Sequence, residues 1–544
     1  MSPSSSVFAR ALVMQRISNR VMNLGDLLTE AARRHPTGQA VVSGDRVWTW
    51  AEMNARVDGA ANSLCKLGIG RGDKVVVHAR NSNEMFETMF AIFKIGAVWV
   101  PTNHRVVPDD VAHIAKTTDA SAVIYDEAFA GHADAALAAG ARLAICIGKP
   151  RPGEYRYGDL VRAGHGNRFH AAPVERDDPC WFFLTSGTTG SPKAGVLTHG
   201  QMAFVINNHL ADLMPGMTEA DRSLVVAPLS HGAGIHQLVQ VARCVGTVLS
   251  DPGSLDPAAV FAVIEKYRIT NIFTVPSILS ALAEHEAADR FDHTSLRHVI
   301  YAGAPMLRAH QKQALRKLGP CLVQYFGLGE VTGNITVLPP HLHAVEDGPE
   351  ARIGTCGYTR TCMRIEIQDA EGRRLGPFET GEICVIGPAV FSGYYNNDTA
   401  NAAAFRNGWF RTGDVGHLDD EGFLYITGRQ SDMFISGGSN IHPLEIEEKL
   451  AAHPDVCEVS VVGIPDNKWG EIGVAAIVLR SPDAPLPDLK SHLTGKIASY
   501  KIPKRFERFE QLPRSGYGKV TKNLVRQALL ERLQAEGDLA EEAR

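Results

Sequence analysis

Residues 180–199 read CWFFLTSGTTGSPKAGVLTH, and this stretch determines how the rest of the chain is interpreted. Its first residues are apolar and aromatic, which is typical of a buried strand. A run of small and hydroxylated residues follows and ends in Lys193. Gly187 and Gly190 allow backbone N–H groups to approach anionic oxygens, the hydroxyl groups add donors, and Lys193 adds a positive charge. The composition predicts a loop that binds a polyphosphate.

This loop differs from the common loop of nucleotide hydrolases, which has Gly directly before its Lys and a helix directly after it. Here Pro192 precedes Lys193, and residues 195–198 read as a second strand. We therefore predict a phosphate-binding loop between two strands, with a Gly/Ser/Thr-rich surface loop as the alternative. The predicted binding residues are Thr185, Ser186, Gly187, Thr188, Thr189, Gly190 and Lys193.

Residues 185–193 resemble the signature of the adenylate-forming superfamily, which includes acyl-CoA synthetases, the adenylation domains of peptide synthetases, and luciferases. The family usually has Gly after this lysine, whereas this chain has Ala194. The resemblance implies an enzyme that binds ATP and Mg²⁺ and, in the acyl-CoA synthetases, coenzyme A as co-substrate.

Length and composition indicate a multidomain enzyme. The chain has 544 residues, of which 44% are hydrophobic and 21% charged, with a formal net charge of −5. One hydrophobic core rarely serves a chain of this length, and the charge balance favours neither nucleic acid nor a membrane surface as partner. No apolar run reaches the roughly 18–20 residues that span a bilayer. The nine cysteines include no C-x-x-C pair, which favours buried free thiols in a reducing compartment.

Residues 1–23 contain several Arg and Ser and no acidic residue. We expect a disordered leader there, with an organelle transit peptide as the alternative, and a cytoplasmic protein. A homodimer is the expected oligomeric state.

The chain is predicted to be an α/β protein. Helices and strands alternate from residue 24 onward, which implies parallel βαβ units in two sheets with helices. Beyond about residue 335 shorter strands and many glycines suit a small antiparallel barrel. A compact α+β module closes the chain, so we expect an N-terminal adenylation domain over residues 24–430 and a mobile C-terminal domain over 431–544.

A second motif, residues 324–330, reads QYFGLGE and resembles the family pattern aromatic-Gly-x-Thr-Glu. Glu330 takes the place of the metal-binding carboxylate, so Thr185 and Glu330 are the predicted Mg²⁺ ligands. Gly329 replaces the usual threonine. The residues predicted to border the adenine are Gly303, Ala304, Pro305, Tyr325, Phe326 and Gly327.

Two further motifs match the family beyond residue 400. Asp414, in WFRTGD, and Arg429 are predicted to bind the ribose hydroxyls, because a carboxylate accepts from both and a guanidinium lies opposite. The resemblance to the ligases of this family implies that Gly437 and Gly438, which have no side chains, line a tunnel for pantetheine after the small domain rotates. Ser431 stands at the pivot, where the family commonly has Asp or Lys.

Lys519, in PRSGYGKV, matches the catalytic lysine of the family, which a mobile domain delivers to the reacting phosphate. His231 lies where the family often has a histidine or an aromatic residue that positions the carboxylate; a helix-capping histidine is the alternative. The predicted acid pocket is neither strongly cationic nor strongly polar, which favours a fatty or aromatic monocarboxylate. Its predicted residues are Asn208, His231, Gly232, Ala233, Tyr301, Leu328 and Asn334.

The combined motifs predict an AMP-forming carboxylate–CoA ligase with Lys519, Glu330 and His231 as catalytic residues. An acyl-AMP ligase that transfers the acyl group to a carrier protein is one alternative, and a catalytically silent nucleotide-binding regulator is another.

Overall fold

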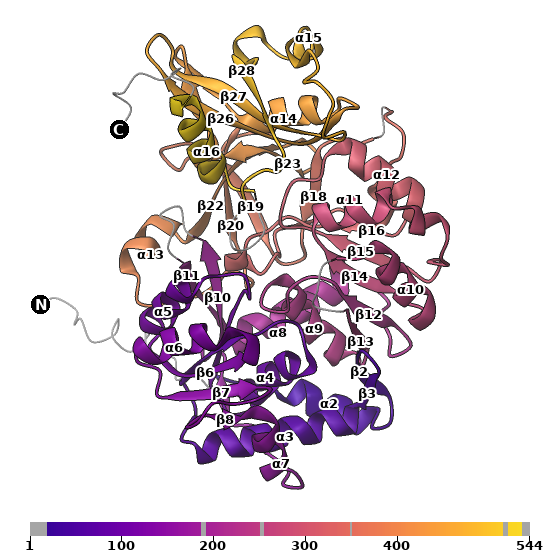
Figure 1. Cartoon of the computed structure of the whole chain (residues 1–544), viewed down its shortest axis with the longest axis vertical. Coiled ribbons are helices and arrows are strands. Elements are labelled where there is room, and N and C mark those ends of the chain that lie inside the picture. The colour runs from indigo at the N-terminus through magenta and orange to yellow at the C-terminus, as the bar shows by residue number, and fades with distance from the viewer. Residues whose placement is uncertain (1–18, 187–191, 251–254, 349–350, 515–519, 536–544) are drawn as a thin grey trace, which may run out of the picture.

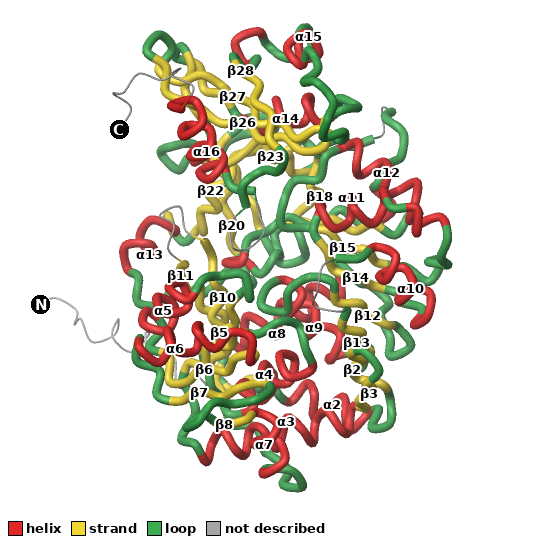
Figure 2. The backbone as a smooth tube through the Cα atoms, viewed as in Figure 1, coloured by secondary structure: helices red, strands yellow, loops and turns green. Residues whose placement is uncertain are grey.

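The computed structural model describes residues 19–186, 192–250, 255–348, 351–514 and 520–535. Figure 1 shows a large body built from three sheets, with the C-terminal module above it. Helices cover the first two sheets, whereas the third, between them and the C-terminal module, is mostly strand and loop (Figure 2). The α/β fold class with a barrel-like third sheet and a small C-terminal module is thereby confirmed.

The first sheet carries the phosphate-loop motif at its edge. Its strands are parallel except for the antiparallel pair of β10 and β11. The helix before β4 begins with a capping box: Thr49 Oγ1 accepts from the Glu52 N–H, and Glu52 accepts from the Thr49 N–H. The strand order is β11 (Pro192–Thr198), β10 (Pro179–Ser186), β5 (Val98–Thr102), β4 (Lys74–His78), β6 (Ala120–Asp126), β7 (Leu143–Ile147), β8 (Tyr155–Arg156). The helices are α3 (Trp50–Lys66), α4 (Asn83–Lys94), α5 (Pro108–Thr117), α6 (Ala130–Ala138) and α7 (Tyr157–Ala163).

The second sheet is parallel apart from the β2–β3 hairpin. Its order is β16 (Leu322–Gln324), β15 (His298–Tyr301), β14 (Asn271–Thr274), β12 (Arg222–Val225), β13 (Gly246–Leu249), β2 (Gln39–Ser43), β3 (Arg46–Thr49). The helices are α2 (Asp26–Arg34), α8 (His199–Asp212), α9 (Gly232–Ala242), α10 (Pro257–Tyr267), α11 (Pro276–Glu284) and α12 (Arg308–Leu318). Helices α8 and α9 lie between the first two sheets: α8 contacts β11, and α9 contacts β13 and β14 (Figure 1).

The third sheet is antiparallel throughout its paired strands. Its order is β17 (Thr336–Val337), β18 (Thr355–Thr359), β23 (Phe423–Arg429), β22 (Trp409–Leu418), β20 (Gly381–Ile386) and β19 (Arg364–Gln368), with β21 (Phe405–Arg406) beside β22 and α13 (Asp398–Ala404) before it. The short 3-10 helix Gln430–Asp432 then connects β23 to the C-terminal module.

The C-terminal module has its own sheet and two apolar clusters of its own. Its strands are β25 (Ser439–Ile441), β24 (Phe434–Ser436), β27 (Gly470–Leu479), β26 (Val456–Asp466) and β28 (Arg505–Phe509). Its helices are α14 (Pro443–Ala451), α15 (Leu489–Leu493) and α16 (Lys522–Ala535). A separate core is what allows such a module to move as a unit.

The described chain begins earlier than the expected end of the leader. Strand β1 (Arg20–Val21) pairs with β9 (Val174–Glu175), and the Asn23 amide donates to the carbonyls of Phe93 and Ala172. The expectation of disorder is therefore wrong for residues 20–23, since their backbone and side chains bond to the body of the protein. Residues 1–18 lie outside the described part. Among the described helices, none has the length and apolarity required to cross a membrane.

Candidate active site

The phosphate-loop motif forms an antiparallel hairpin. In the β10–β11 register Thr185 lies opposite Lys193 and Ser186 opposite Pro192, so the two strands enclose residues 187–191. Gly187, Thr188, Thr189 and Gly190 lie outside the described residues. Strand β11 leads into α8, whose N-cap Thr198 accepts from the Gln201 N–H. The described residues on either side of this segment thus have the strand-to-strand form that the sequence indicated.

Glu330 lies beside this hairpin, in a 3-10 turn that spans Gly329–Val331. Glu330 is 7% exposed, and its Oε1 accepts a 2.8 Å hydrogen bond from the hydroxyl of Tyr394. Burial, followed by the Glu330 carboxylate, raises the pKa of Tyr394, so the phenol stays protonated and remains a donor. The Lys193 Nζ lies 5.4 Å from the centre of the same ring, and the Thr185 side chain is another neighbour of this phenol.

Backbone hydrogen bonds join residues 391–395 both to β11 and to Glu330. The Val196 N–H donates to the Gly393 carbonyl, and the Tyr395 N–H donates to the Ala194 carbonyl. The Phe391 N–H in turn donates to the Glu330 carbonyl over 2.7 Å. The Ala194 methyl group is buried in an apolar cluster, which explains why this chain accommodates a side chain where the family usually has glycine.

Two glycines of the QYFGLGE motif allow close approaches. A Cβ on Gly327 would lie 2.4 Å from the Gly333 Cα, so the two backbones cross there in contact. A Cβ on Gly329 would lie 2.4 Å from Cδ1 of Phe183. In this chain the Phe183 ring therefore occupies the space that the side chain of the usual threonine would need.

The donors present fit a hydrated Mg²⁺. Mg²⁺ is usually held by one or two carboxylates together with waters and substrate phosphates, and not by a cage of protein ligands. Glu330 offers one carboxylate whose Oε1 is oriented by Tyr394, and Thr185 offers a hydroxyl near the same phenol. Consistent with this, the described residues contain no group of three or more His, Cys, Asp and Glu that could hold a metal alone.

The predicted ribose residues meet across the third sheet. Asp414 on β22 lies opposite Arg429 on β23, and Arg429 Nε donates to Asp414 Oδ1 over 3.0 Å. Asp414 is 5% exposed, and burial raises its pKa while the Arg429 guanidinium opposes that shift. The Asp414 carboxylate raises the pKa of Arg429, which therefore stays charged. The pair presents one carboxylate in a fixed orientation.

The residues predicted to border the adenine lie partly at the exposed edge of the second sheet and partly in the interior. Gly303, Ala304 and Pro305 are exposed just beyond the carboxyl end of β15, which is the edge where open α/β sheets bind ligands. Phe326 is partly buried beyond the end of β16. Tyr325, in contrast, is 8% exposed, and its ring is stacked 6.1 Å from that of Phe273. Tyr325 therefore belongs to the interior between α9 and the second sheet.

His231 is the N-cap residue of α9, but its side chain makes no capping hydrogen bond. Instead its Nδ1 lies 2.9 Å from the Ser230 hydroxyl, and its ring meets the edge of Phe183 at 5.6 Å. The structure thus places His231 beside β10, at the start of α9, and does not support the capping interpretation.

The residues predicted to line the acid pocket have different surroundings in the structure. A buried cavity lies between α9 and the second sheet, and of the predicted residues only Ala233 lines it. Tyr301 points to the opposite face of the sheet, where its hydroxyl bonds with Gln311, Gln324 and His343; the neighbouring Ile300 faces the cavity. The Asn208 amide donates to Asp212 and to a backbone carbonyl. Leu328 is partly buried and packs against the main core. Asn334 is fully buried, and it does not line the cavity.

Two family models match the chain: AMP-binding enzyme over residues 28–395, and AMP-binding enzyme C-terminal domain over residues 445–519. The chain belongs to the AMP-binding enzyme family. Its relatives include a feruloyl-CoA synthase from an Amycolatopsis species, 34% identical over 510 residues that cover 93% of this chain and 99% of the relative. Another is the indoleacetate–CoA ligase of Aromatoleum aromaticum, 32% identical, with coverage of 93% and 98%.

Solved structures agree with this assignment. The o-succinylbenzoate CoA synthetase of Bacillus subtilis, in complex with an acyl-adenylate intermediate, is similar at a TM-score of 0.82 and 28% identity, covering 94% of this chain and 98% of that one. The predictions of an adenylate-forming enzyme and of its ligase class are confirmed.

In this member of the AMP-binding enzyme family, Gly437 and Gly438 form the turn between β24 and β25. Both have positive φ, +57° and +81°, as a two-residue hairpin turn of this kind requires. A Cβ on Gly437 would lie 2.8 Å from the Trp469 ring, which is exposed and has Lys468 and Lys504 near its face. Sequence reasoning missed Trp469, although an aromatic residue between polar neighbours in DNKWGE was a signal.

Lys519 lies outside the described residues. The residues on either side of its segment, Arg514 and Val520, form an antiparallel bridge, and Arg514 donates to Glu458 on β26 over 2.6 Å. Ser431 donates to its neighbour Asp432 at the exposed connection between the third sheet and the C-terminal module.

Tyr394 is a second functional candidate that sequence reasoning missed. It follows an aromatic, a serine and a glycine in FSGYYNN, which reads as an ordinary turn. Tyr394 reaches Glu330 because this segment forms backbone hydrogen bonds with β11, about 200 residues earlier in the chain, and no local sequence signal indicates that contact.

Proposed function

We propose that this protein is an AMP-forming carboxylate–CoA ligase that activates a fatty or aromatic monocarboxylic acid. The observation that carries the proposal is the convergence of Lys193, Tyr394 and the buried Glu330 beside the β10–β11 hairpin. These groups are suited to hold a polyphosphate and its counter-ion, and CoA ligases among the relatives support the choice of thiol.

In the first half-reaction an oxygen of the acid's carboxylate forms a bond to the α-phosphorus of ATP. The bond from that phosphorus to the oxygen bridging to the β-phosphate breaks, and pyrophosphate leaves. Lys193 and the hydroxyl-rich loop would hold the departing phosphates, and Asp414 would accept hydrogen bonds from the ribose hydroxyls. Glu330 and Thr185 would hold Mg²⁺, which when bound offsets phosphate charge.

In the second half-reaction the CoA thiolate forms a bond to the acyl carbon, and the bond from that carbon to the AMP oxygen breaks. We propose that Lys519 serves the first step and that the turn at Gly437 and Gly438 serves the second, after a rotation of residues 431–544 against residues 24–430. The exposed Trp469 beside this turn, with two lysines near its ring, is suited to contact the nucleotide part of CoA.

The test is pyrophosphate release by the purified protein with a panel of acids, followed by analysis of the nucleotide product. We expect AMP, not ADP, and thioester only when CoA is present. Lys519→Ala should lose adenylation yet still form thioester from a supplied acyl-adenylate. Equal loss of both half-reactions would refute the division of labour, and transfer to a phosphopantetheine carrier without transfer to CoA would favour the acyl-AMP ligase.

A further inference from the structure

The residues predicted to bind the two reactants belong to different sheets. The hairpin of β10 and β11, which is predicted to hold the phosphates, is part of the first sheet. His231, which is predicted to position the acid's carboxylate, follows β12 of the second sheet. A carboxylate oxygen must approach the α-phosphorus in line with the departing pyrophosphate. The alignment of the two sheets at this edge therefore decides whether the separately bound reactants meet in a reactive geometry.

The side chain of Asn81 joins the two sheets at this edge. Asn81 follows β4, and both β4 and β10 run parallel to β5, so Asn81 lies at the same edge as the phosphate loop. The Asn81 Nδ2 donates to the Ala227 carbonyl over 2.9 Å. The Asn81 Oδ1 accepts from the Leu229 N–H, also over 2.9 Å. One amide group of the first sheet thus holds two backbone groups of the loop that follows β12.

The loop that Asn81 holds is buried but belongs to no helix or strand. Ala227 is 3% exposed and Leu229 is 2% exposed. Buried backbone donors and acceptors need partners, which regular secondary structure usually supplies. Here the Asn81 amide supplies a donor to one of these groups and an acceptor to the other. The position of the loop therefore depends on the position of this side chain.

Asn81 is itself attached to a rigid element. The next residue, Ser82, is the N-cap of α4, and its Oγ accepts from the Met85 N–H over 3.1 Å. Every residue of α4 except Glu84 is buried. Groups that position a reactant are most precise when they are attached to well-packed helices and strands. The Asn81 amide meets this condition, because its backbone enters a capped and buried helix.

The loop leads directly to His231. The His231 N–H donates to the Pro228 carbonyl over 3.2 Å, and the Gly234 N–H donates to the His231 carbonyl over 2.9 Å. A Cβ on Gly234 would lie 2.1 Å from the Leu229 carbonyl oxygen, so the first turn of α9 packs tightly on the same loop. A displacement of this loop would therefore also displace the His231 side chain.

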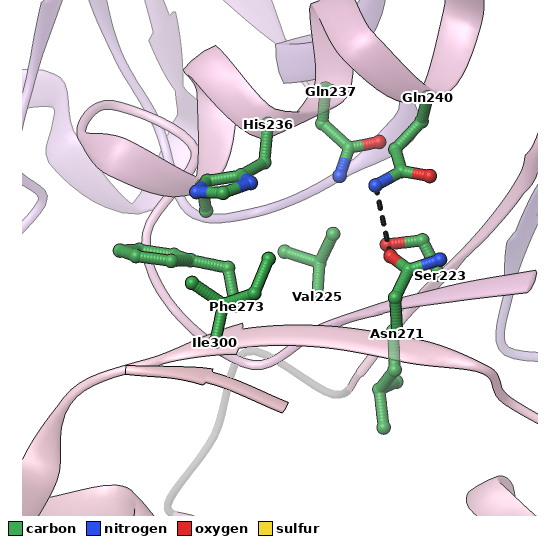
Figure 3. A pocket seen from close by; sticks show the side chains of 10 residues that line it. Ser223, Val225, His236, Gln237, Gln240, Asn271, Phe273 and Ile300 are labelled. Atoms are coloured by element: carbon green, nitrogen blue, oxygen red, sulfur yellow. Dashed lines mark hydrogen bonds between the residues drawn. The ribbon is translucent and has the colours of Figure 1, made fainter. Parts of the chain in front are cut away.

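Aromatic rings from both sheets support the start of α9. The edge of Phe183, from the first sheet, meets the His231 ring at 5.6 Å. From the second sheet, the Phe273 ring lies beneath the helix, where a Cβ on Gly232 would come within 2.7 Å of its Cζ (Figure 3). Apolar contacts are non-directional, whereas hydrogen bonds depend on distance and angle. The two bonds of Asn81 thus add a directional constraint to this packing.

We propose that Asn81 is a positioning residue for the adenylation step, and that its amide aligns the loop before His231 so that the acid's carboxylate faces the α-phosphorus of ATP. The inference rests on the proposed ligase function. It predicts an effect on the first half-reaction alone. In the acyl-adenylate the carboxylate oxygen and the phosphorus are already bonded, so the second half-reaction no longer requires their alignment.

The experiment compares Asn81→Leu, which removes both hydrogen bonds and keeps the size of the side chain, with the control Asn62→Leu. Asn62 on α3 is also partly buried, and its Nδ2 donates to the carbonyls of Asp58 and Asn167 over 2.9 and 2.8 Å. The control therefore also loses two hydrogen bonds to backbone groups. Pyrophosphate release is measured with the fastest acid of the panel, and thioester formation with the synthetic acyl-adenylate of that acid and CoA.

Asn81→Leu should lower kcat/KM for the acid in pyrophosphate release by about ten- to a hundredfold. The KM for ATP and the rate of thioester formation should stay within about threefold of the wild type, and Asn62→Leu should leave all three quantities within that range. Asn81→Asp is a second variant, which keeps the acceptor for the Leu229 N–H but has no donor for the Ala227 carbonyl. It should show the same selective loss.

Several results would overturn the inference while the wild type still forms AMP. These are equal loss of both half-reactions, an Asn81→Leu protein as active as Asn62→Leu, and failure of both Asn81 variants to fold, which would assign the residue to stability. Circular dichroism distinguishes the last result from the others. Absence of AMP formation by the wild type with every acid would instead overturn the ligase function, and the inference with it.

Discussion

Replacing Gly329 by threonine, the residue usual in the family, should impair this enzyme because Phe183 already occupies the space. The added Cβ would lie 2.4 and 2.5 Å from Cδ1 and Cε1 of Phe183 and 3.2 Å from Cγ2 of Thr185. Carbon atoms in contact are normally about 3.5–4.0 Å apart, so the ring must retreat by roughly 1 Å or more. Gly329 lies in a 3-10 turn that any residue adopts, so the penalty is steric and not one of backbone strain.

The displaced ring would disturb its neighbours. The edge of Phe183 meets His231 at 5.6 Å, and its ring lies 5.9 Å from Trp181. Overpacking of this kind costs about 1–3 kcal/mol, and a shift of about 1 Å in positioning groups lowers a rate by up to roughly a hundredfold. We therefore expect Gly329→Thr to lower the melting temperature by roughly 1–3 °C and kcat for adenylation by about ten- to a hundredfold.

A second substitution tests the cause. Phe183→Leu should cost about 1–2 kcal/mol alone, but with Gly329→Thr the two should compensate, giving a coupling of at least about 1 kcal/mol. Thermal unfolding and pyrophosphate release measure both effects. Gly131→Thr is the control, since a Cβ there meets no atom within 4 Å. A fully active Gly329→Thr enzyme, or a double variant no better than the sum of its parts, would refute the steric explanation.

Three other changes have defined outcomes. Tyr394→Phe removes the 2.8 Å hydrogen bond to Glu330 and should lower the rate of pyrophosphate release about tenfold with an unchanged circular dichroism spectrum; an unchanged rate would contradict the orienting role. Asp414→Asn should raise the KM for ATP about tenfold and reduce discrimination against 2′-deoxy-ATP, and an unchanged KM would contradict ribose binding. Burial lowers the pKa of His199 from 6.5 to about 4. The neutral imidazole therefore contributes fully to the free energy of unfolding above pH 6.5, and this contribution is lost as the pH falls toward 4. The loss amounts to about 2 kcal/mol at pH 5. His199→Gln should therefore show a smaller fall in melting temperature between pH 7.5 and 5 than the wild type and the control His35→Gln, and an equal fall in all three would contradict this account.

Much of the fold was predictable because its signals are local. Alternating apolar strands and helices predicted the parallel sheets, and Pro192 before Lys193 predicted a strand after the loop instead of a helix. Asp414 and Arg429 come from two strands joined by a short turn, so a hairpin register brings them together without any long-range contact. For these features the physical cause lies within about 20 residues of sequence.

The site residues that escaped prediction depend on contacts between distant segments. Tyr394 reaches Glu330 only because residues 391–395 pair with β11. The sequence predicts that Tyr301 lines the acid pocket, but neighbouring strand residues face opposite sides of a sheet. With helices on both faces, nothing in the alternation shows whether Ile300 or Tyr301 faces α9.

The polar face of α9 is buried and not exposed to solvent. His236, Gln237 and Gln240 lie at positions i, i+1 and i+4 and share one side of the helix. A polar side normally indicates the solvent face, yet residues 233–241 are all buried, because α8 covers α9 on one side and the second sheet covers it on the other. Once solvent is excluded, polar side chains must find partners within the protein or in a ligand. Those of His236 and Gln240 remain partly unpaired beside a small cavity, and the sequence pattern alone could not separate this buried polar face from an exposed one.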